Sequence, residues 1–237
     1  MAMSYPASQP PAQMQEAFAA IYSSSTAVVR QGQQPGGRSD RGEIALSVTP
    51  GLLTRLGPDQ YALISLERDD LGAHVDKGAL SIAYLKRQGG QWRLQHRWDE
   101  FAWSGNTGRP ADWLTIIRRA GAPPLVFAVT SDFHQGQGLT TGVAIALADD
   151  APQSLGELTL AGELEVNNGC DVKACGAYAY QGSIETAHSP RVAFTVTYRG
   201  WSIAPGGSAP RHRLYRVVTY HIRHGALVGS RAAALPD

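Results

Sequence analysis

Acidic, imidazole and amide side chains gather in two polar segments of this 237-residue chain. Each segment follows an apolar run and ends in glycine: ERDDLGAHVDKG from Glu67 and SDFHQGQGLTTG from Ser131. Such groups are the usual ligands of divalent cations and the usual partners of sugar hydroxyls. The candidate ligand-binding residues are therefore Asp69, Asp70, His74, Asp76, Asp132, His134 and Gln135.

Two uses of these side chains are open at the level of sequence. If both segments are long loops at the same edge of related strand units, their acids and imidazoles meet at one cleft. A hydrolase acting on a polysaccharide would use two such carboxylates as its acid and base. Loops are also polar simply because they face water. No nucleophile-elbow, zinc-protease, phosphate-loop or EF-hand motif occurs, and we expect neither a cofactor nor a resident metal.

The C-terminal part of the chain has a strong excess of positive charge. No acid occurs between Thr186 and Pro236. The same stretch holds seven arginines: Arg191, Arg199, Arg211, Arg213, Arg216, Arg223 and Arg231. Arginines in such numbers can attract an anionic polymer or an acidic protein, unless acids of earlier strands pair with them across a sheet.

The densest part of this stretch, RHRLYRVVTYHIRHG from Arg211, alternates between two classes of side chain. Alternation predicts a strand with one core face and one wet, basic face. The core face would carry Leu214, Val218, Tyr220 and Ile222, and the wet face Arg211, Arg213, Tyr215, Val217, Thr219, His221 and Arg223. Arg213, Tyr215 and Arg216 are candidate ligand-binding residues, since an arginine can meet an anion and an aromatic ring can stack on a ligand ring.

The only two cysteines, Cys170 and Cys175, lie in the turn-like stretch NNGCDVKACG. A structural zinc site needs four ligands, and a redox pair prefers two intervening residues at a helix start, so neither fits well. We predict a disulfide that fixes one loop and stabilises the fold by about 2 kcal/mol. It implies a periplasmic or secreted protein, whereas two free thiols would suit the cytosol.

Composition limits the class of protein further. A net charge of +1 with 17% charged residues is not typical of general polyanion binders, and we recognise no specific nucleic-acid motif. No apolar run of about 18 residues predicts a membrane-spanning helix. The sequence begins without a signal-peptide pattern, which a processed protein would also lack.

The period of the apolar residues changes along the chain. Residues 1–13 predict a flexible tail, and the apolar residues that follow recur at helical spacing, at Met14, Phe18, Ile21 and Tyr22. Residues 14–42 are therefore predicted to form a short helix and a polar connector that starts at Arg30. From residue 43 to 237 alternation and frequent turn residues predict a single all-β domain.

A weak internal repeat organises that domain. YALISL at Tyr61 and LVFAVT at Leu125 are 64 residues apart, and VAFTVT at Val192 follows after 67 more. We predict about three antiparallel meanders of four strands each, in a propeller-like, barrel or sandwich arrangement.

The sequence does not decide whether the protein is an enzyme. We predict a non-enzymatic, extracytoplasmic binding protein that recognises a glycan, an anionic polymer or a protein partner. The alternative is the polysaccharide hydrolase with acids from the two polar segments.

Overall fold

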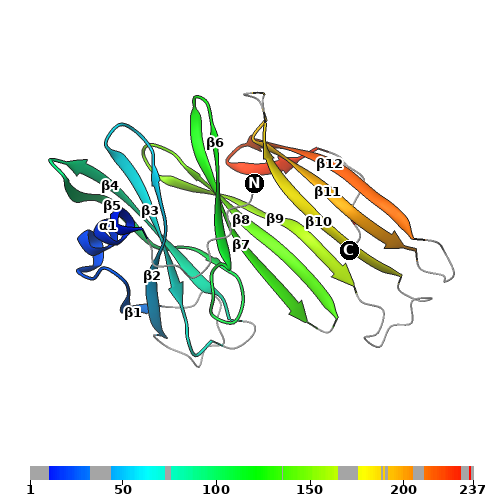
Figure 1. Ribbon diagram of the computed structural model, residues 1–237, viewed down its shortest axis with the longest axis horizontal. Coiled ribbons are helices and arrows are strands. Elements are labelled where there is room, and N and C mark those ends of the chain that lie inside the picture. Colours follow the sequence, from blue (N-terminus) through cyan, green and yellow to red (C-terminus); the bar gives the residue numbers. More distant parts are fainter. Residues whose placement is uncertain are drawn as a thin grey trace. The chain divides into compact units, whose positions relative to one another are not determined.

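The computed structural model describes residues 11–32, 44–72, 76–134, 136–164, 176–187, 189, 192–204, 211–230 and 235 (Figure 1). Within these ranges the chain forms one helix and thirteen strands. The elements are α1 (Ala12–Tyr22), β1 (Val28–Gly32), β2 (Ile44–Arg55), β3 (Gln60–Arg68), β4 (Gly78–Gln88), β5 (Gln91–Ser104), β6 (Trp113–Arg119), β7 (Ala122–His134), β8 (Gln137–Leu147), β9 (Pro152–Leu164), β10 (Ala177–Thr186), β11 (Phe194–Ile203), β12 (His212–Arg223) and β13 (Ala226–Gly229).

The strands follow one another as meanders, as the alternating pattern predicted. One sheet has the order β1-β2-β3-β4-β5 and the other the order β13-β12-β11-β10-β9-β8-β7-β6. The segments 64 residues apart, from Tyr61 and from Leu125, fall in β3 and β7, and the repeat itself stays a prediction. The mainly β, antiparallel fold with a short N-terminal helix is thus confirmed. The second and third predicted meanders continue into each other as one sheet of eight strands.

The chain divides into two compact units. Unit 1 comprises Met1–Ile116, Val126–Thr130 and Leu147–Pro152, and unit 2 comprises Ile117–Leu125, Ser131–Ala146 and Gln153–Asp237. Unit 1 therefore holds α1 and β1 to β5, whereas unit 2 holds most of β8 and β9 and all of β10 to β13. Whether residues 43–237 fold as a single domain stays a prediction.

Helix α1 covers one face of the first sheet. Met14, Ala17 and Phe18 are buried against Val48 of β2, Leu63 of β3 and Leu85 of β4. Burying a side chain the size of Phe18 stabilises a fold by about 1.5–3 kcal/mol, which is ample for a helix of three turns. The helix ends where Ser23 adopts a left-handed conformation (φ 57°) and its N–H donates to the carbonyl of Ala19 at 2.9 Å.

A buried ionic network lies on the same face of the sheet and holds β1. The Glu67 side chain, on β3, is completely buried, and both its carboxylate oxygens accept from the Arg30 guanidinium. The Ser81 hydroxyl donates to the same carboxylate. Arg30 also donates through Nη1 to Glu100 of β5 at 3.0 Å.

This network explains one wrong prediction. The polar connector was expected from Arg30, but β1 extends through Gly32 and pairs with β2, with Gly32 opposite Ile44. The polar side chain of Arg30 does not mark a loop here, because it neutralises a buried carboxylate two strands away.

In unit 2, the inner face of β9 to β12 is filled by aromatic rings. Tyr198 of β11 is buried, and its hydroxyl donates to the carbonyl of Thr159 at 2.7 Å. Phe194 stacks on Tyr220 with 4.8 Å between ring centroids. Gly200 is required beside them, since a Cβ atom at that position would overlap the carbonyl oxygen of Ala179. The opposite, outer face of these strands carries exposed side chains such as Gln181, Arg199 and Arg213, although Thr197 on the same face is buried.

Candidate functional site

The first polar segment is a loop between β3 and β4, as predicted. Asp69 is buried, and its Oδ1 accepts from the N–H of Leu71 at 3.0 Å, which closes a tight turn. Gly108 fastens the loop at both ends, because its carbonyl accepts from the Asp69 N–H and its N–H donates to the carbonyl of Asp76. Asp70 is exposed. The fourth candidate of this segment, His74, lies outside the described residues.

A hollow of about 540 Å³ in unit 1 adjoins this loop. Its lining is Val29, Ile44, Ala45, Ser47, Asp69, Asp70 and Leu71. The lining is largely aliphatic. Asp69 accepts a hydrogen bond that closes the turn, so Asp70 is the exposed carboxylate among these lining residues.

The second polar segment was predicted to be a long loop, and this is wrong. Strand β7 runs on to His134 and β8 begins at Gln137, so the segment is a tight hairpin. The hydroxyls of Ser131 and Thr140 form a hydrogen bond of 2.9 Å across the hairpin. Gly136 adopts the positive φ (75°) that a short turn requires. Gln135 lies outside the described residues, and the structure describes His134 only through its backbone.

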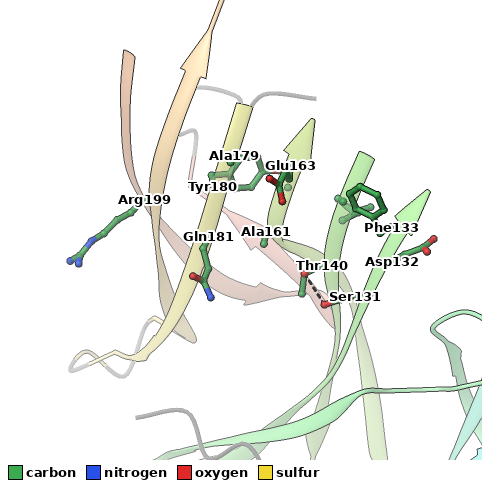
Figure 2. A pocket seen from close by; sticks show the side chains of 13 residues that line it. Ser131, Asp132, Phe133, Thr140, Ala161, Glu163, Ala179, Tyr180, Gln181 and Arg199 are labelled. Atoms are coloured by element: carbon green, nitrogen blue, oxygen red, sulfur yellow. Dashed lines mark hydrogen bonds between the residues drawn. The ribbon is translucent and has the colours of Figure 1, made fainter. Parts of the chain in front are cut away.

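The hairpin borders a hollow of about 490 Å³ on the outer face of unit 2 (Figure 2). Its lining is Ser131, Asp132, Phe133, Gly138, Leu139, Thr140, Ala161, Gly162, Glu163, Ala179, Tyr180, Gln181 and Arg199. Of the predicted site residues only Asp132 is among them. Successive strand residues point to opposite faces, so Asp132 projects away from the side shared by Ser131 and Phe133. Figure 2 shows its carboxylate directed outward, on the far side of Phe133 from Glu163.

The hollow exists because three neighbouring strands place small residues on its floor. In the register of β9 and β10, Glu163 lies opposite Ala179 and Ala161 lies opposite Gln181. A Cβ atom at Gly138 of β8 would lie 3.3 Å from the Phe133 ring and 3.5 Å from the Cβ of Glu163, so this glycine belongs to the same surface. Larger side chains stand around the floor. Phe133 is 58% exposed at one edge, and Arg199 extends from β11 at the other (Figure 2).

The outer face continues from the hollow onto β11 and β12. Arg199 lies opposite Tyr215, and Trp201 lies opposite Arg213. The faces predicted for β12 agree with its burial, since Leu214 and Val218 are buried and Arg213 and Tyr215 are exposed. We call Arg199, Trp201, Arg211, Arg213 and Tyr215 the arginine-aromatic stripe. Arg223 lies further along the same face.

Two arginines of the stripe stack on its aromatic rings. The Arg211 guanidinium lies 4.3 Å from the centroid of the Trp201 ring. That of Arg199 lies 5.9 Å from the centroid of the Tyr215 ring. Each contact contributes about 0.5–1 kcal/mol at an exposed site and keeps the guanidinium beside the ring.

The alternative was that acids of earlier strands pair with the stripe. Glu163 of β9 and Glu185 of β10 lie on the same outer face, but no described ion pair joins them to it. The outer-face partners of β12 are threonine, arginine and tryptophan on β11, and Val228 and Ala226 on β13. Within the part of the chain that the structure describes, neither Arg211 nor Arg213 forms an ion pair with Asp or Glu. The stripe therefore retains its positive charge on the wet face.

Arg216, the remaining predicted site residue, belongs to the other face of β12. It lies opposite Tyr198, a residue of the inner aromatic layer, and donates through Nη1 to the carbonyl of Tyr215 at 3.0 Å. Although exposed, it is not a neighbour of Arg213 on the same surface.

Sequence reasoning found Arg213 and Tyr215 and missed the rest of this surface. Phe133, Glu163, Gln181, Arg199 and Trp201 come from four strands and share no motif. Parity along β11 was the available signal, because Arg199 and Trp201 alternate with the buried Tyr198.

The predicted disulfide and the compartment it implies remain predictions, because Cys170 and Cys175 lie outside the described residues. Among the residues that the structure describes, no group of three or more His, Cys, Asp or Glu side chains could hold a metal ion. The same residues include no helix that is long and apolar enough to cross a bilayer. No protein-family model, curated protein or solved structure matches the chain.

The hydrolase hypothesis required two loops to bring acids together. The second segment is a hairpin rather than a loop, and Asp69 and Asp132 belong to different compact units. Within unit 2 the two acids that border the hollow, Asp132 and Glu163, point away from each other (Figure 2). The hydrolase hypothesis stays a prediction. The surface on which the structure places candidate binding residues next to one another is the outer face of unit 2.

Proposed function

We propose that this chain is a binding protein that holds an anionic polymer on the outer face of β11 and β12. One observation supports it above the others: the arginine-aromatic stripe places three arginines on one wet face. In the strand register Arg199 lies opposite Gln181 and Tyr215, and Arg213 lies opposite Trp201, so neither faces an acid. The described charged residues on the outer face of β11 and β12 are arginines, and acids of the same sheet face, such as Glu163 and Glu185, lie on β9 and β10. A region of one sign attracts a partner of the other sign.

The stripe has the dimensions of an extended ligand. Outer-face residues along one strand are about 7 Å apart, and neighbouring strands are about 4.8 Å apart. Several negative charges of one extended chain can therefore meet several guanidiniums at once. Each exposed pair contributes only about 0.2–1 kcal/mol, so a single small anion would bind weakly and a polymer much better.

Such binding must depend on salt. The charges are exposed, and their attraction is screened over about 10 Å at 0.1 M ionic strength. We expect the full chain to bind immobilised polyanions at 20–50 mM NaCl and to lose affinity steadily as NaCl rises. The probes are polygalacturonate, single-stranded poly(dT) and inorganic polyphosphate, each tested by titration at several salt concentrations.

A matched pair of charge reversals tests the surface itself. Arg213→Glu lies on the stripe, and Arg216→Glu makes the same change of net charge on the same strand but on the other face. We expect Arg213→Glu to weaken binding of the best probe about tenfold at low salt and to reduce the salt slope by about one, and Arg216→Glu to do much less. Equal effects of the two variants, or no binding of any probe, would remove the proposal.

We also propose that this binding takes place outside the cytoplasm. The support is the predicted pairing of Cys170 with Cys175 in a turn-like segment.

A further inference from the structure

We infer that the anionic polymer is an acidic polysaccharide, and that one of its sugar rings occupies the hollow between Phe133 and Arg199. This inference rests on the proposed function, because it extends the same binding face by one subsite. Arg199 belongs to both surfaces: it lines the hollow and also lies opposite Tyr215 in the stripe. A chain bound along the stripe is therefore led directly into the hollow.

The polar groups of the hollow suit a ligand rich in hydroxyls. Glu163 offers a carboxylate, Gln181 an amide that both donates and accepts, and Ser131 and Thr140 a pair of hydroxyls already bonded to each other at 2.9 Å. In the register of β9, β10 and β11, Ala161, Gln181 and Arg199 form one row across the sheet. A sugar ring in this row would meet Gln181 through its hydroxyls. The Arg199 guanidinium extends away from the hollow (Figure 2), toward Tyr215, so it would meet an acidic group at the edge of that ring or on the next sugar along the stripe.

The size and shape of the hollow fit a ring. Its volume is about 490 Å³, and its floor consists of Gly138, Ala161 and Ala179, so a flat ligand can approach the backbone. Phe133 stands at the edge with 58% of its surface exposed. An exposed phenyl ring provides the apolar surface on which the C–H face of a sugar packs.

Two features disfavour a single-stranded nucleic acid. Binding of bases relies on open aromatic faces, but the rings of Trp201 and Tyr215 each carry a guanidinium over one face. Glu163 adds a negative charge at the hollow, where it repels any anionic group but accepts hydrogen bonds from hydroxyls. A sugar ring can therefore enter with its hydroxyls toward Glu163 and its acidic group toward the Arg199 edge, whereas a nucleotide has fewer hydroxyls to offer. A chain of phosphates alone would gain nothing from Phe133.

The test compares polygalacturonate, poly(dT) and polyphosphate on variants of the hollow. Phe133→Ala removes the exposed ring, and Ala161→Gln fills the floor without changing charge. Val228→Ala is the matched control, because Val228 is an exposed aliphatic residue of β13 on the same sheet face. Thermal unfolding of each variant shows whether it is folded as the parent chain is.

We expect Phe133→Ala and Ala161→Gln each to weaken polygalacturonate binding about fivefold or more, with less than a twofold change for polyphosphate and poly(dT) and none for Val228→Ala. If both hollow variants leave polygalacturonate binding unchanged, or weaken all three probes equally, the subsite is refuted. Tighter binding of poly(dT) than of polygalacturonate by the parent chain would also refute it and indicate a nucleic acid. The proposed function fails separately, through equal effects of Arg213→Glu and Arg216→Glu.

Discussion

The buried carboxylate of Glu67 allows a quantitative test of what holds β1 to the first sheet. Both of its oxygens face the Arg30 guanidinium, and the carboxylate is completely buried. Among the described residues, replacing Arg30 by Met leaves the Ser81 hydroxyl as the remaining side-chain hydrogen-bond donor to this carboxylate. It also removes the cation that pairs with Glu100. Breaking a buried ion pair in this way costs about 3–5 kcal/mol.

We expect the lower end of that range, about 3 kcal/mol, for Arg30→Met. The reason is that 18% of the Arg30 side-chain surface is exposed, so water partly solvates the guanidinium. For a chain of this size the cost corresponds to a fall in melting temperature of about 6–12 °C. The assay is urea unfolding of the full chain followed by tryptophan fluorescence.

Two further variants make the reasoning refutable. The double variant Arg30→Met with Glu67→Leu removes both charges and should recover most of the loss, since a buried ion pair is often no better than an apolar pair of similar size. Arg97→Met breaks an exposed pair with Asp99 and a contact with the Tyr22 ring at 5.0 Å, and should cost about 1–2 kcal/mol. The account is wrong if Arg30→Met costs no more than Arg97→Met, or if the losses of Arg30→Met and Glu67→Leu simply add.

Two other predictions concern pH and the cysteines. Burial raises the pKa of Tyr198 and of Tyr84 above the ordinary value of 10.0, so the folded state holds these protons to higher pH than the unfolded chain. The stability they contribute is therefore complete below pH 10 and is lost as the pH rises beyond it. We expect the urea midpoint of the parent chain to fall between pH 9 and 11, and that of Tyr198→Phe to fall less steeply. An equally steep fall in the variant would count against this explanation. Cys170 and Cys175 should resist alkylation in denaturant until a reductant is added, and Cys→Ser at both positions should lower the unfolding free energy by about 2 kcal/mol; ready alkylation without reductant would show free thiols.

Strand periodicity could be predicted from the sequence because burial on one face imposes it at every second residue. The core face of β12 followed from Leu214 and Val218 alone. The polar segment from Ser131 was misjudged because an exposed hairpin end needs no apolar face. Ser131 and Thr140 satisfy each other across the strands, so their polarity marks a wet hairpin as easily as a loop.

The site was less predictable than the fold because it depends on register between strands. Arg213 and Tyr215 could be placed on one face from their own strand. The hollow is made of small side chains at Gly138, Ala161 and Ala179, and nothing in any one strand shows that these three are neighbours. Arg30 and Glu67 are likewise 37 residues apart and meet only in the folded sheet.

Successive residues of β12 point to opposite faces of the sheet, so two sets of residues on one strand are under different structural constraints. Its even-numbered core positions, such as Leu214 and Val218, are constrained by the aromatic layer beneath them, whereas Arg211, Arg213 and Tyr215 touch only the surface. Substitution of Arg211 or Tyr215 loses a ring contact of about 0.5–1 kcal/mol, and other exposed substitutions usually change the folding free energy by less than about 0.5 kcal/mol. Most variants in a library randomised at Arg211, Arg213 and Tyr215 should therefore fold, while their ligand preference changes. The sheet could thus serve as a scaffold for engineered binding proteins.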